Sequence, residues 1–362
     1  MRTLKCLKVF SPCCAFGLAL AFSFVGCGDD SSSVAPAPVS AASSSSGTSS
    51  PVVDPALTSS DGSAPVLQSS SDAAAAIDPN AANYWSNPIT LAVVPDSNGF
   101  YDVGDVYKAV PATSKLVFVL RHAEREKSEG QESLLTEKGV QQALSVGAKL
   151  AGGDDAFYYS STDFIRTRET CNNIAKGRGE TAYETVTWDG IDGGYFLKVP
   201  SDTMSNYARN RGSSWKMISQ WAYNDPNVSA AFAQKIPEYF YDLMPRGDQF
   251  ISEVILANMA GWKRVSVLVT HDILIAPLII YATNRTIDLK FFESGKWSNY
   301  LAGIAVVVDE ANTVTLLPVR GVERGYMYTE QRQAKLDSLA ALEAGQGSAP
   351  DVAPEVAPEV AP

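Results

Sequence analysis

The chain has 362 residues, and its 29 basic against 40 acidic side chains give a formal net charge of -11. Between residues 82 and 335 the charges nearly balance, with 26 basic and 29 acidic side chains. This part therefore has no positive field to attract nucleic acid, and nucleic acid is excluded as an expected partner. The composition of both ends does not suit a packed core, so we expect one folded domain, residues 83–335.

The first 27 residues have the pattern of a targeting segment. Three basic residues lie within the first eight positions, an apolar run follows from 9 to 25, and Cys27 ends it before a polar stretch. The pattern resembles a bacterial lipoprotein signal peptide, which implies that Cys27 is lipidated and begins the mature protein. The protein would then be exported and lipid-anchored to the cell envelope, on its periplasmic or surface side. An ordinary cleaved signal peptide is the alternative.

Two further segments lack the composition of a folded domain. Residues 28–82 are rich in Ser, Ala and Pro, which predicts a disordered tether spanning on the order of 40 Å. Residues 336–362 contain the end of a last helix and then a Val-Ala-Pro-Glu repeat. A proline in every fourth position excludes a helix there, so the repeat predicts an extended tail.

The folded part begins with a segment that looks irregular and then alternates between strand and helix. From 84 to 114, prolines and glycines break any long element, and we expect this stretch to wrap around the domain. Buried strands are predicted at 116–120, 156–160, 265–270, 304–308 and 314–319. Helices are predicted from Thr136 onward, around Arg166, and at 250–261, 273–282 and 329–344.

This alternation predicts an α/β fold, a three-layer α/β/α sandwich with a mostly parallel central sheet. The helix after Thr136 should bury the face made by Val140, Ala143, Leu144, Gly147, Ala148 and Ala151. Residues 177–245 are rich in Trp and Tyr among glycines, which predicts an inserted cap of mixed structure. Cys171, the one cysteine of the expected mature domain apart from Cys27, is expected to be a buried thiol.

The two histidines of the chain both follow predicted buried strands. His122 comes directly after Arg121 at the end of the first strand, and His271 comes directly after the strand at 265–270. Arg166 follows the strand at 156–160, and Asp272 follows His271. Because ligands in open α/β sheets bind outside the carboxyl ends of the strands, we expect these side chains to meet. Phosphoryl transfer needs such a set: cations, a nucleophile and an acid.

Four segments taken in order resemble the motifs of the histidine phosphatase superfamily, which includes phosphoglycerate mutase-like proteins and histidine acid phosphatases. The segments are RHAER, LTEKGVQQALSVGAKL, SSTDFIRTRET and THDILIAPLI. The resemblance implies that His122 attacks phosphorus and becomes phosphohistidine, while Arg121, Arg166 and His271 bind the phosphate. It implies a phosphomonoesterase acting on a small phosphorylated substrate, without metal or cofactor.

The proton donor differs between the branches of the superfamily. Asp272 matches the donor of the acid phosphatase branch, and Arg125 matches the extra substrate-binding arginine of that branch. The mutase-like branch takes its acid from the region after the second arginine, where Glu184, Asp189 and Asp192 are the alternative proton donors. The sequence interpretation favours Asp272.

Two other functions are compatible with the same motifs. Ala123 stands where the first motif has glycine, which leaves open a catalytically weak or inactive surface module that binds a phosphate ligand. A mutase-like phosphotransferase is the second alternative, and the predicted export argues against it. The sequence carries no indication of the oligomeric state.

Overall fold

The computed structural model describes residues 91–127 and 130–346. The predicted signal peptide with Cys27, the tether at 28–82 and the repeat tail lie outside the described residues. Within the described part, no helix is both long enough and apolar enough to cross a membrane.

A seven-stranded sheet forms the centre of the molecule, in the order β1-β8-β7-β2-β5-β3-β4. Its strands are β1 (Tyr101–Asp102), β2 (Lys115–Arg121), β3 (Phe157–Ser161), β4 (Thr185–Thr187), β5 (Val265–Thr270), β7 (Ala302–Val308) and β8 (Val314–Arg320). The pairs β1–β8, β2–β5, β5–β3 and β3–β4 are parallel, whereas β2–β7 and β7–β8 are antiparallel. The predicted mostly parallel sheet is confirmed, and the strands predicted at 304–308 and 314–319 pair with each other as the antiparallel β7 and β8.

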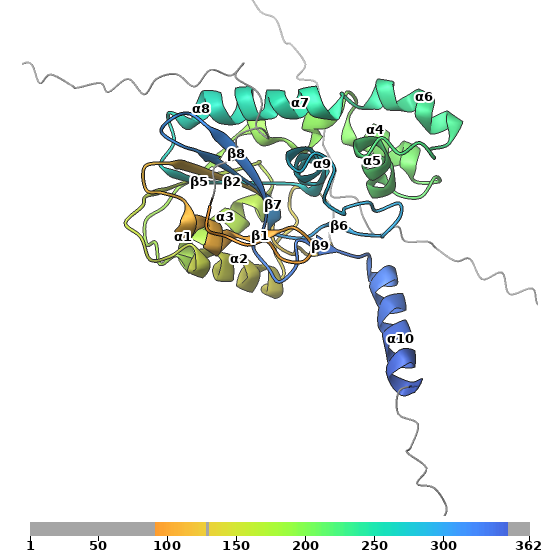
Figure 1. The fold of residues 1–362 in the computed structure, drawn as a ribbon, viewed down its shortest axis with the longest axis horizontal. Coiled ribbons are helices and arrows are strands. Elements are labelled where there is room, and N and C mark those ends of the chain that lie inside the picture. The colour runs from red at the N-terminus through yellow and green to blue at the C-terminus, as the bar shows by residue number, and fades with distance from the viewer. Residues whose placement is uncertain (1–90, 128–129, 347–362) are drawn as a thin grey trace, which may run out of the picture.

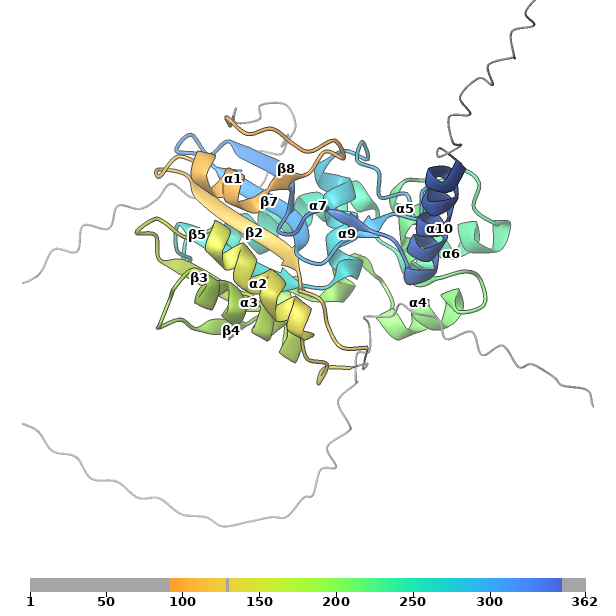
Figure 2. The same cartoon turned by 90° about the horizontal axis from the view of Figure 1, so that it is seen from below.

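Helices cover both faces of the sheet, which confirms the three-layer sandwich (Figures 1 and 2). One face carries α1 (Val103–Ala109), α2 (Glu137–Lys149) and α3 (Ile165–Gly177). The other carries α7 (Leu243–Gln249), α8 (Ala257–Met259) and α9 (Asp272–Ala282), with a π-helical segment, η3 (Phe250–Leu256), between α7 and α8. The helix predicted at 250–261 is thus the second part of a helical run that begins at Leu243. The central strands β2, β5 and β7 lie between the two helical layers and are buried on both sides, which explains their continuous apolar runs.

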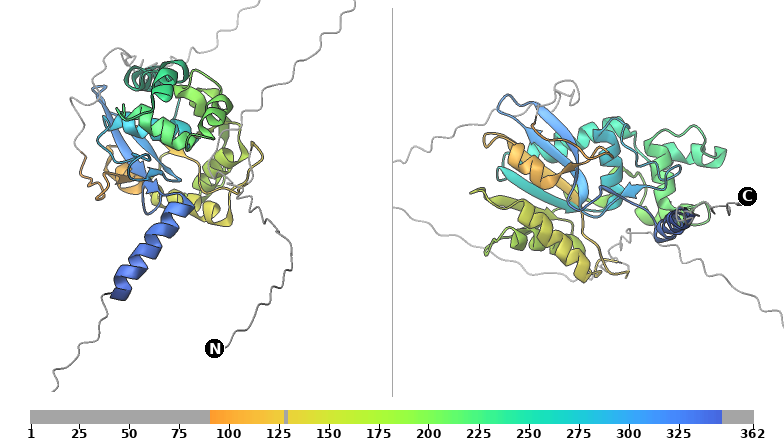
Figure 3. Two further views of the ribbon diagram at one scale, coloured as in Figure 1. Left: turned by 90° about the vertical axis from the view of Figure 1, so that its right-hand side faces the viewer. Right: turned by 60° about the horizontal axis from the view of Figure 1, so that its bottom comes forward.

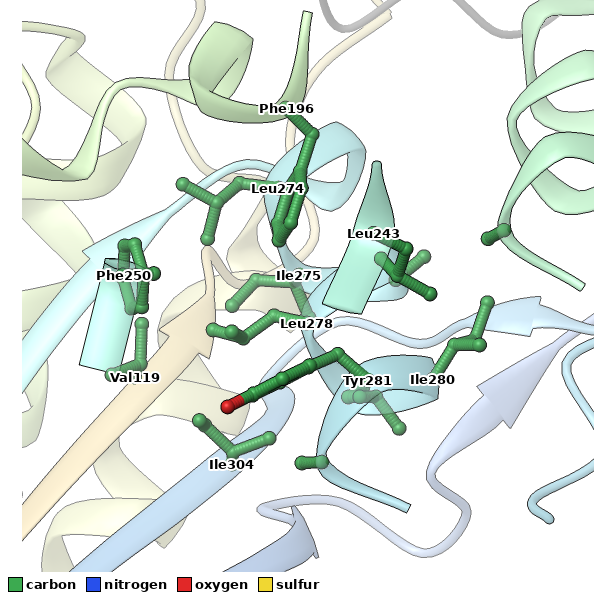
Figure 4. Packing of buried hydrophobic residues seen from close by; sticks show 14 of the residues in the cluster. Val119, Phe196, Leu243, Phe250, Leu274, Ile275, Leu278, Ile280, Tyr281 and Ile304 are labelled. Atoms are coloured by element: carbon green, nitrogen blue, oxygen red, sulfur yellow. The ribbon is translucent and has the colours of Figure 1, made fainter. Parts of the chain in front are cut away.

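Helix α9 is buried along its whole length, which explains why its sequence is apolar on all sides and has no polar face for solvent (Figure 4). Leu278 and Tyr281 of α9 belong to the same buried cluster as Val119 of β2 and Ile304 of β7. Pro277 lies within the helix and does not end it. This packing fixes the first turn of α9, which follows β5 directly.

Helix α2 begins as predicted, with the side chain of Thr136 accepting a hydrogen bond from the backbone N–H of Gly139. The predicted buried face was partly wrong. Ala143 and Gly147 are buried, but Ala148 is exposed, and Val146 and Leu150 are buried in its place. The other predicted positions, Val140, Leu144 and Ala151, are half-buried. The stripe is rotated because α3 approaches α2 closely at Gly147.

The prediction that residues 84–114 are irregular was wrong for Val103–Ala109, which forms α1. Asp102 accepts a hydrogen bond from the backbone N–H of Gly104 and so caps the helix. Val103 and Val106 are buried in the core, and Pro111 comes only after the helix has ended. Tertiary burial and the Asp102 N-cap therefore offset the low helix propensity of Gly104.

The range predicted as a cap, 177–245, starts at the end of α3 and contributes β4 to the edge of the sheet. Two short 3₁₀ helices follow, η1 (Asp189–Ile191) and η2 (Gly193–Phe196). The α-helices α4 (Ser201–Ala208), α5 (Ser214–Ala222) and α6 (Ala230–Tyr239) come next and lie together beside α9 (Figure 1). Trp215 and Trp221 of α5 are buried there. The last helix, α10 (Glu330–Gln346), projects from the body of the molecule (Figure 3).

Candidate active site

The ends of two neighbouring strands, β2 and β5, bring the two histidines together. Arg121 at the end of β2 is in register with Thr270 at the end of β5. One residue further on, the backbone N–H of His122 donates to the carbonyl of Thr270 over 3.0 Å. The ring centroids of His122 and His271 consequently lie 5.7 Å apart.

The ring of His122 is buried, and its contacts decide which nitrogen can act as a nucleophile. Nδ1 lies 2.7 Å from the carbonyl oxygen of Ala123, which can only accept, so Nδ1 carries the proton in this contact. In the neutral ring the lone pair is then on Nε2. The ring of Tyr300 lies beside His122, at 5.8 Å between centroids.

His271 is oriented by Arg166 and by a threonine pair. Nη2 of Arg166 donates to Nδ1 of His271 over 3.3 Å, and Nε2 of His271 lies 3.0 Å from Oγ1 of Thr162. Thr162 in turn lies 2.9 Å from the hydroxyl of Thr167. These contacts assign the proton of neutral His271 to Nε2.

Arg166 is buried in the first turn of α3 and is held from several directions. Nη1 donates to the carbonyl of Gly130 over 2.8 Å, and the guanidinium lies 4.4 Å above the centre of the Phe164 ring. Behind it, the hydroxyl of Thr170 accepts from the backbone N–H of Ala123 and donates to the carbonyl of Arg166. Thr170 therefore fixes the spacing between the first and second motifs.

Arg121 is the second buried arginine of the site. Nη1 donates to the carbonyl of Ser298 over 2.8 Å, in β6 (Trp297–Ser298). The guanidinium lies 4.4 Å from the centre of the Tyr300 ring, and Nη2 lies 3.6 Å from Oδ2 of Asp272. Two guanidinium groups thus frame the histidine pair, with Arg121 and Arg166 each 1% exposed.

Asp272 opens α9 and is fully buried. Besides Arg121, its Oδ2 accepts a hydrogen bond of 2.8 Å from Nε1 of Trp297. A guanidinium, an indole N–H and the N-terminus of a helix all stabilise a negative charge. Asp272 therefore lies within the site, in surroundings that favour a carboxylate.

The alternative acids lie at different ends of β4. Glu184 precedes the strand, about 10 Å back from its carboxyl end, so the structure does not bring it to the histidines. Asp189 and Asp192 follow the carboxyl end, and both are exposed. A Cβ on Gly193, next to Asp192, would lie 3.4 Å from Cβ of His271, so this loop borders the site.

The remaining candidates lie further out. Arg125 is half-buried, and its Nη1 donates to the carbonyl of Glu126 over 2.8 Å. Cys171 is buried within α3, as predicted, and its thiol donates to the carbonyl of Ser160. Burial raises the pKa of this thiol, which makes it a poor nucleophile. Among the residues that the structure describes, no group of three or more His, Cys, Asp or Glu side chains could hold a metal ion.

Sequence reasoning missed the residues that contact the site side chains Arg121, Arg166, His271 and Asp272. They are Thr162, Phe164, Trp297, Ser298, Tyr300 and Met327, whose Sδ lies 3.4 Å from Nη1 of Arg121. Thr162 and Phe164 belong to the second motif and could have been found by adjacency. The segment around Trp297 is far from every motif, and no spacing signal pointed to it.

Family comparison agrees with this geometry. The sequence model of the histidine phosphatase superfamily (branch 1) matches residues 117–317, which is more than half of the chain. The chain therefore belongs to the histidine phosphatase superfamily, whose members are phosphatases or mutases. This membership supports a phosphatase-like enzyme. A search among curated proteins found no match.

Solved structures of low sequence identity are similar to parts of the chain. A phosphoglycerate mutase from Bacillus anthracis is 18% identical, with 57% of this chain and 93% of that chain covered and a TM-score of 0.39. A mycobacterial glucosyl-3-phosphoglycerate phosphatase is 14% identical, with 58% and 100% covered and a TM-score of 0.36. A phosphoserine phosphatase mutant from Entamoeba histolytica, in complex with phosphoserine, is 16% identical, with 53% and 89% covered and a TM-score of 0.33.

Proposed function

We propose that the protein is a phosphomonoesterase that acts through a phosphohistidine on His122, without a metal ion. The observation that carries this proposal is the placement of His122 and His271, with ring centroids 5.7 Å apart, between the buried Arg121 and Arg166. Buried cations that are already oriented stabilise the charge of a transferring phosphoryl group without reorganisation. The substrate is a small phosphorylated molecule.

The reaction has two steps. Nε2 of His122 attacks phosphorus, a P–N bond forms, the ester P–O bond breaks, and the leaving oxygen takes a proton from a carboxylic acid. Water then attacks the phosphohistidine, the P–N bond breaks, and the carboxylate takes the proton of the water. Phosphate leaves and neutral His122 is restored, so one difficult step has become two easier ones.

The contacts of the carboxylates favour a donor from the loop after β4. Asp272 is buried against Arg121 and Trp297, and these partners stabilise its charged form rather than its acid form. Asp192 is exposed at the border of the site, in the region that supplies the acid in the mutase-like branch. In this proposal Asp192 protonates the leaving group, with Asp189 as the alternative and Asp272 as the assignment first expected from the sequence.

The proposal includes export and lipid anchoring through Cys27, supported by the sequence pattern of residues 1–27. The test is incorporation of labelled palmitate into the full chain in a bacterial host. Label is expected in the wild type and absent in Cys27→Ser, whereas equal labelling of both would contradict the anchor. A soluble, unlabelled wild type of reduced mass would instead indicate ordinary signal cleavage.

The enzymatic test is hydrolysis of a chromogenic phosphomonoester by the purified protein in the presence of a chelator. Turnover with an acid-labile phosphoenzyme is expected for the wild type, and neither is expected for His122→Ala. Turnover that persists in His122→Ala would refute the mechanism. Phosphate binding without turnover across a substrate panel would favour the binding module, and transfer that requires a phosphorylated primer would favour the mutase.

A further inference from the structure

A fully buried tryptophan outside the motifs contacts the phosphate-binding machinery through one carboxylate. Trp297 donates from Nε1 to Oδ2 of Asp272 over 2.8 Å, and the same oxygen lies 3.6 Å from Nη2 of Arg121. Trp297 and Asp272 are 0% exposed, and Arg121 is 1% exposed. Water cannot replace Trp297 or Arg121 at this buried carboxylate, so these two contacts help to offset its desolvation.

The carboxylate limits where the guanidinium of Arg121 can point. The carbonyl of Ser298 accepts from Nη1, the Tyr300 ring lies under the guanidinium plane, and Asp272 lies beside Nη2. Ser298 directly follows Trp297 in β6, which pairs with β9 (Tyr326–Met327). Strand β6 therefore supports Arg121 in two ways. The carbonyl of Ser298 accepts a hydrogen bond from Arg121, and Trp297 holds Asp272, which lies beside Arg121.

The cap helices hold Trp297 in place. The indole stacks on Trp215 of α5, with ring centroids 5.4 Å apart and an angle of 16° between the planes. Phe291 packs edge-on against both indoles. The ring of Trp297 cannot rotate without disturbing this cluster, so its N–H has one direction, toward Asp272.

We infer that Trp297 is a positioning residue, which acts through Asp272 to hold Arg121 in the orientation that binds phosphate. The inference rests on the proposed function, because it assigns a phosphate-binding role to Arg121. It also gives the cap a second role, since α5 fixes Trp297 and so reaches the site from outside the motifs. Asp272 becomes the anchor of Arg121 rather than the proton donor.

The experiment compares two variants that each lose one indole N–H. Trp297→Phe removes the N–H that faces Asp272, whereas Trp221→Phe removes a buried N–H that donates to the carbonyl of Tyr241 in the cap. The measurements are the dissociation constant of inorganic phosphate, kcat and KM for a chromogenic ester, and the unfolding midpoint. We expect Trp297→Phe to weaken phosphate binding and lower kcat/KM by on the order of 10-fold, because a misdirected reacting group loses rate steeply. Trp221→Phe should keep both values.

Equal phosphate affinity in the two variants, with only the unfolding midpoint lowered, would overturn the inference. A wild type that neither binds phosphate nor turns over would instead overturn the proposed function. Asp272→Asn keeps the shape of the carboxylate and supplies the test if Trp297→Phe does not fold. We expect it to lower kcat/KM by a similar factor for good and poor leaving groups, whereas a loss confined to poor leaving groups would make Asp272 the donor and refute the anchor.

Discussion

Arg166 donates a hydrogen bond from Nη2 to Nδ1 of His271, 105 residues further along the chain, over 3.3 Å. Arg166 lies in the first turn of α3, and His271 is the N-cap of α9, directly after β5. The contact joins two elements that approach only because β3 and β5 are neighbours in the sheet. Each residue therefore limits the orientation of the other, and a change at Arg166 should disturb His271.

Arg166→Lys keeps the positive charge but loses the planar group that reaches Gly130 and His271 together. We expect kcat/KM for a chromogenic phosphomonoester to fall by on the order of 100-fold, because a lysine cannot hold phosphate with two parallel bonds. The matched control is Arg168→Lys, two residues along the same helix and exposed. A smaller loss of kcat/KM for Arg166→Lys than for Arg168→Lys would show that Arg166 is not the phosphate-binding arginine of this helix.

The proton donor can be identified from the dependence of rate on the leaving group. An acid helps an alkyl phosphate, which leaves as a basic alkoxide, far more than a nitrophenyl phosphate. We expect Asp192→Asn to lower kcat/KM by about 100-fold or more for the alkyl ester and by less than about 10-fold for the nitrophenyl ester. Asp189→Asn is the comparison. Equal losses on both esters for Asp192→Asn would exclude Asp192 as the donor.

Thr170→Val replaces the hydroxyl that accepts from Ala123 and donates to Arg166 by a methyl group of similar size. The buried backbone N–H of Ala123 then loses its acceptor, which should lower the free energy of unfolding by about 1–3 kcal/mol. Activity should fall as well, because the His122 turn loosens. Urea unfolding and kcat/KM measure the two effects. Thr283→Val at the end of α9 removes a hydroxyl that donates to the carbonyls of Ile279 and Ile280 in the same helix, and it should leave kcat/KM unchanged.

Gly147→Ala should destabilise the contact between α2 and α3. A Cβ at Gly147 would lie 2.1 Å from the carbonyl oxygen of Ile174, which is backbone and cannot move aside. We expect a loss of about 1–3 kcal/mol in the free energy of unfolding, as for other overpacked cores. The neighbouring Ala148 is exposed, so Ala148→Ser should change stability by less than about 0.5 kcal/mol. Unchanged stability in Gly147→Ala would show that the helices can separate at this point.

Because burial raises the pKa of Cys171, we expect the free energy of unfolding to fall at alkaline pH. The folded protein holds the thiol proton more tightly than the unfolded chain, so the stabilisation is complete below the unfolded pKa of about 8.5 and declines as pH rises above it toward the folded pKa. From pH 8.5 to 9.5 this group should reduce the free energy of unfolding by about 1 kcal/mol. Denaturant titrations of the wild type and Cys171→Ala give the difference. Parallel pH profiles would contradict the prediction.

Local sequence patterns determined the elements of the core. The apolar runs at 116–120 and 265–270 predicted β2 and β5 to within a residue, because strands buried on both faces need uninterrupted apolar residues. The cap of Thr136 likewise marked the start of α2. Where burial decided the outcome, local patterns failed: α1 forms around Gly104, and α2 turns a different face to α3 than the one predicted.

Sequence motifs predicted the family and the five side chains that come together beside the carboxyl ends of the strands, since parallel strands present these ends at one edge of a sheet. The contacts that orient these side chains arise from tertiary packing. The hydrogen bond between Trp297 and Asp272 spans 25 residues, and the stack of Trp297 on Trp215 joins the cap to the segment before β7. Such contacts depend on how whole layers pack and leave no periodic signal in the chain.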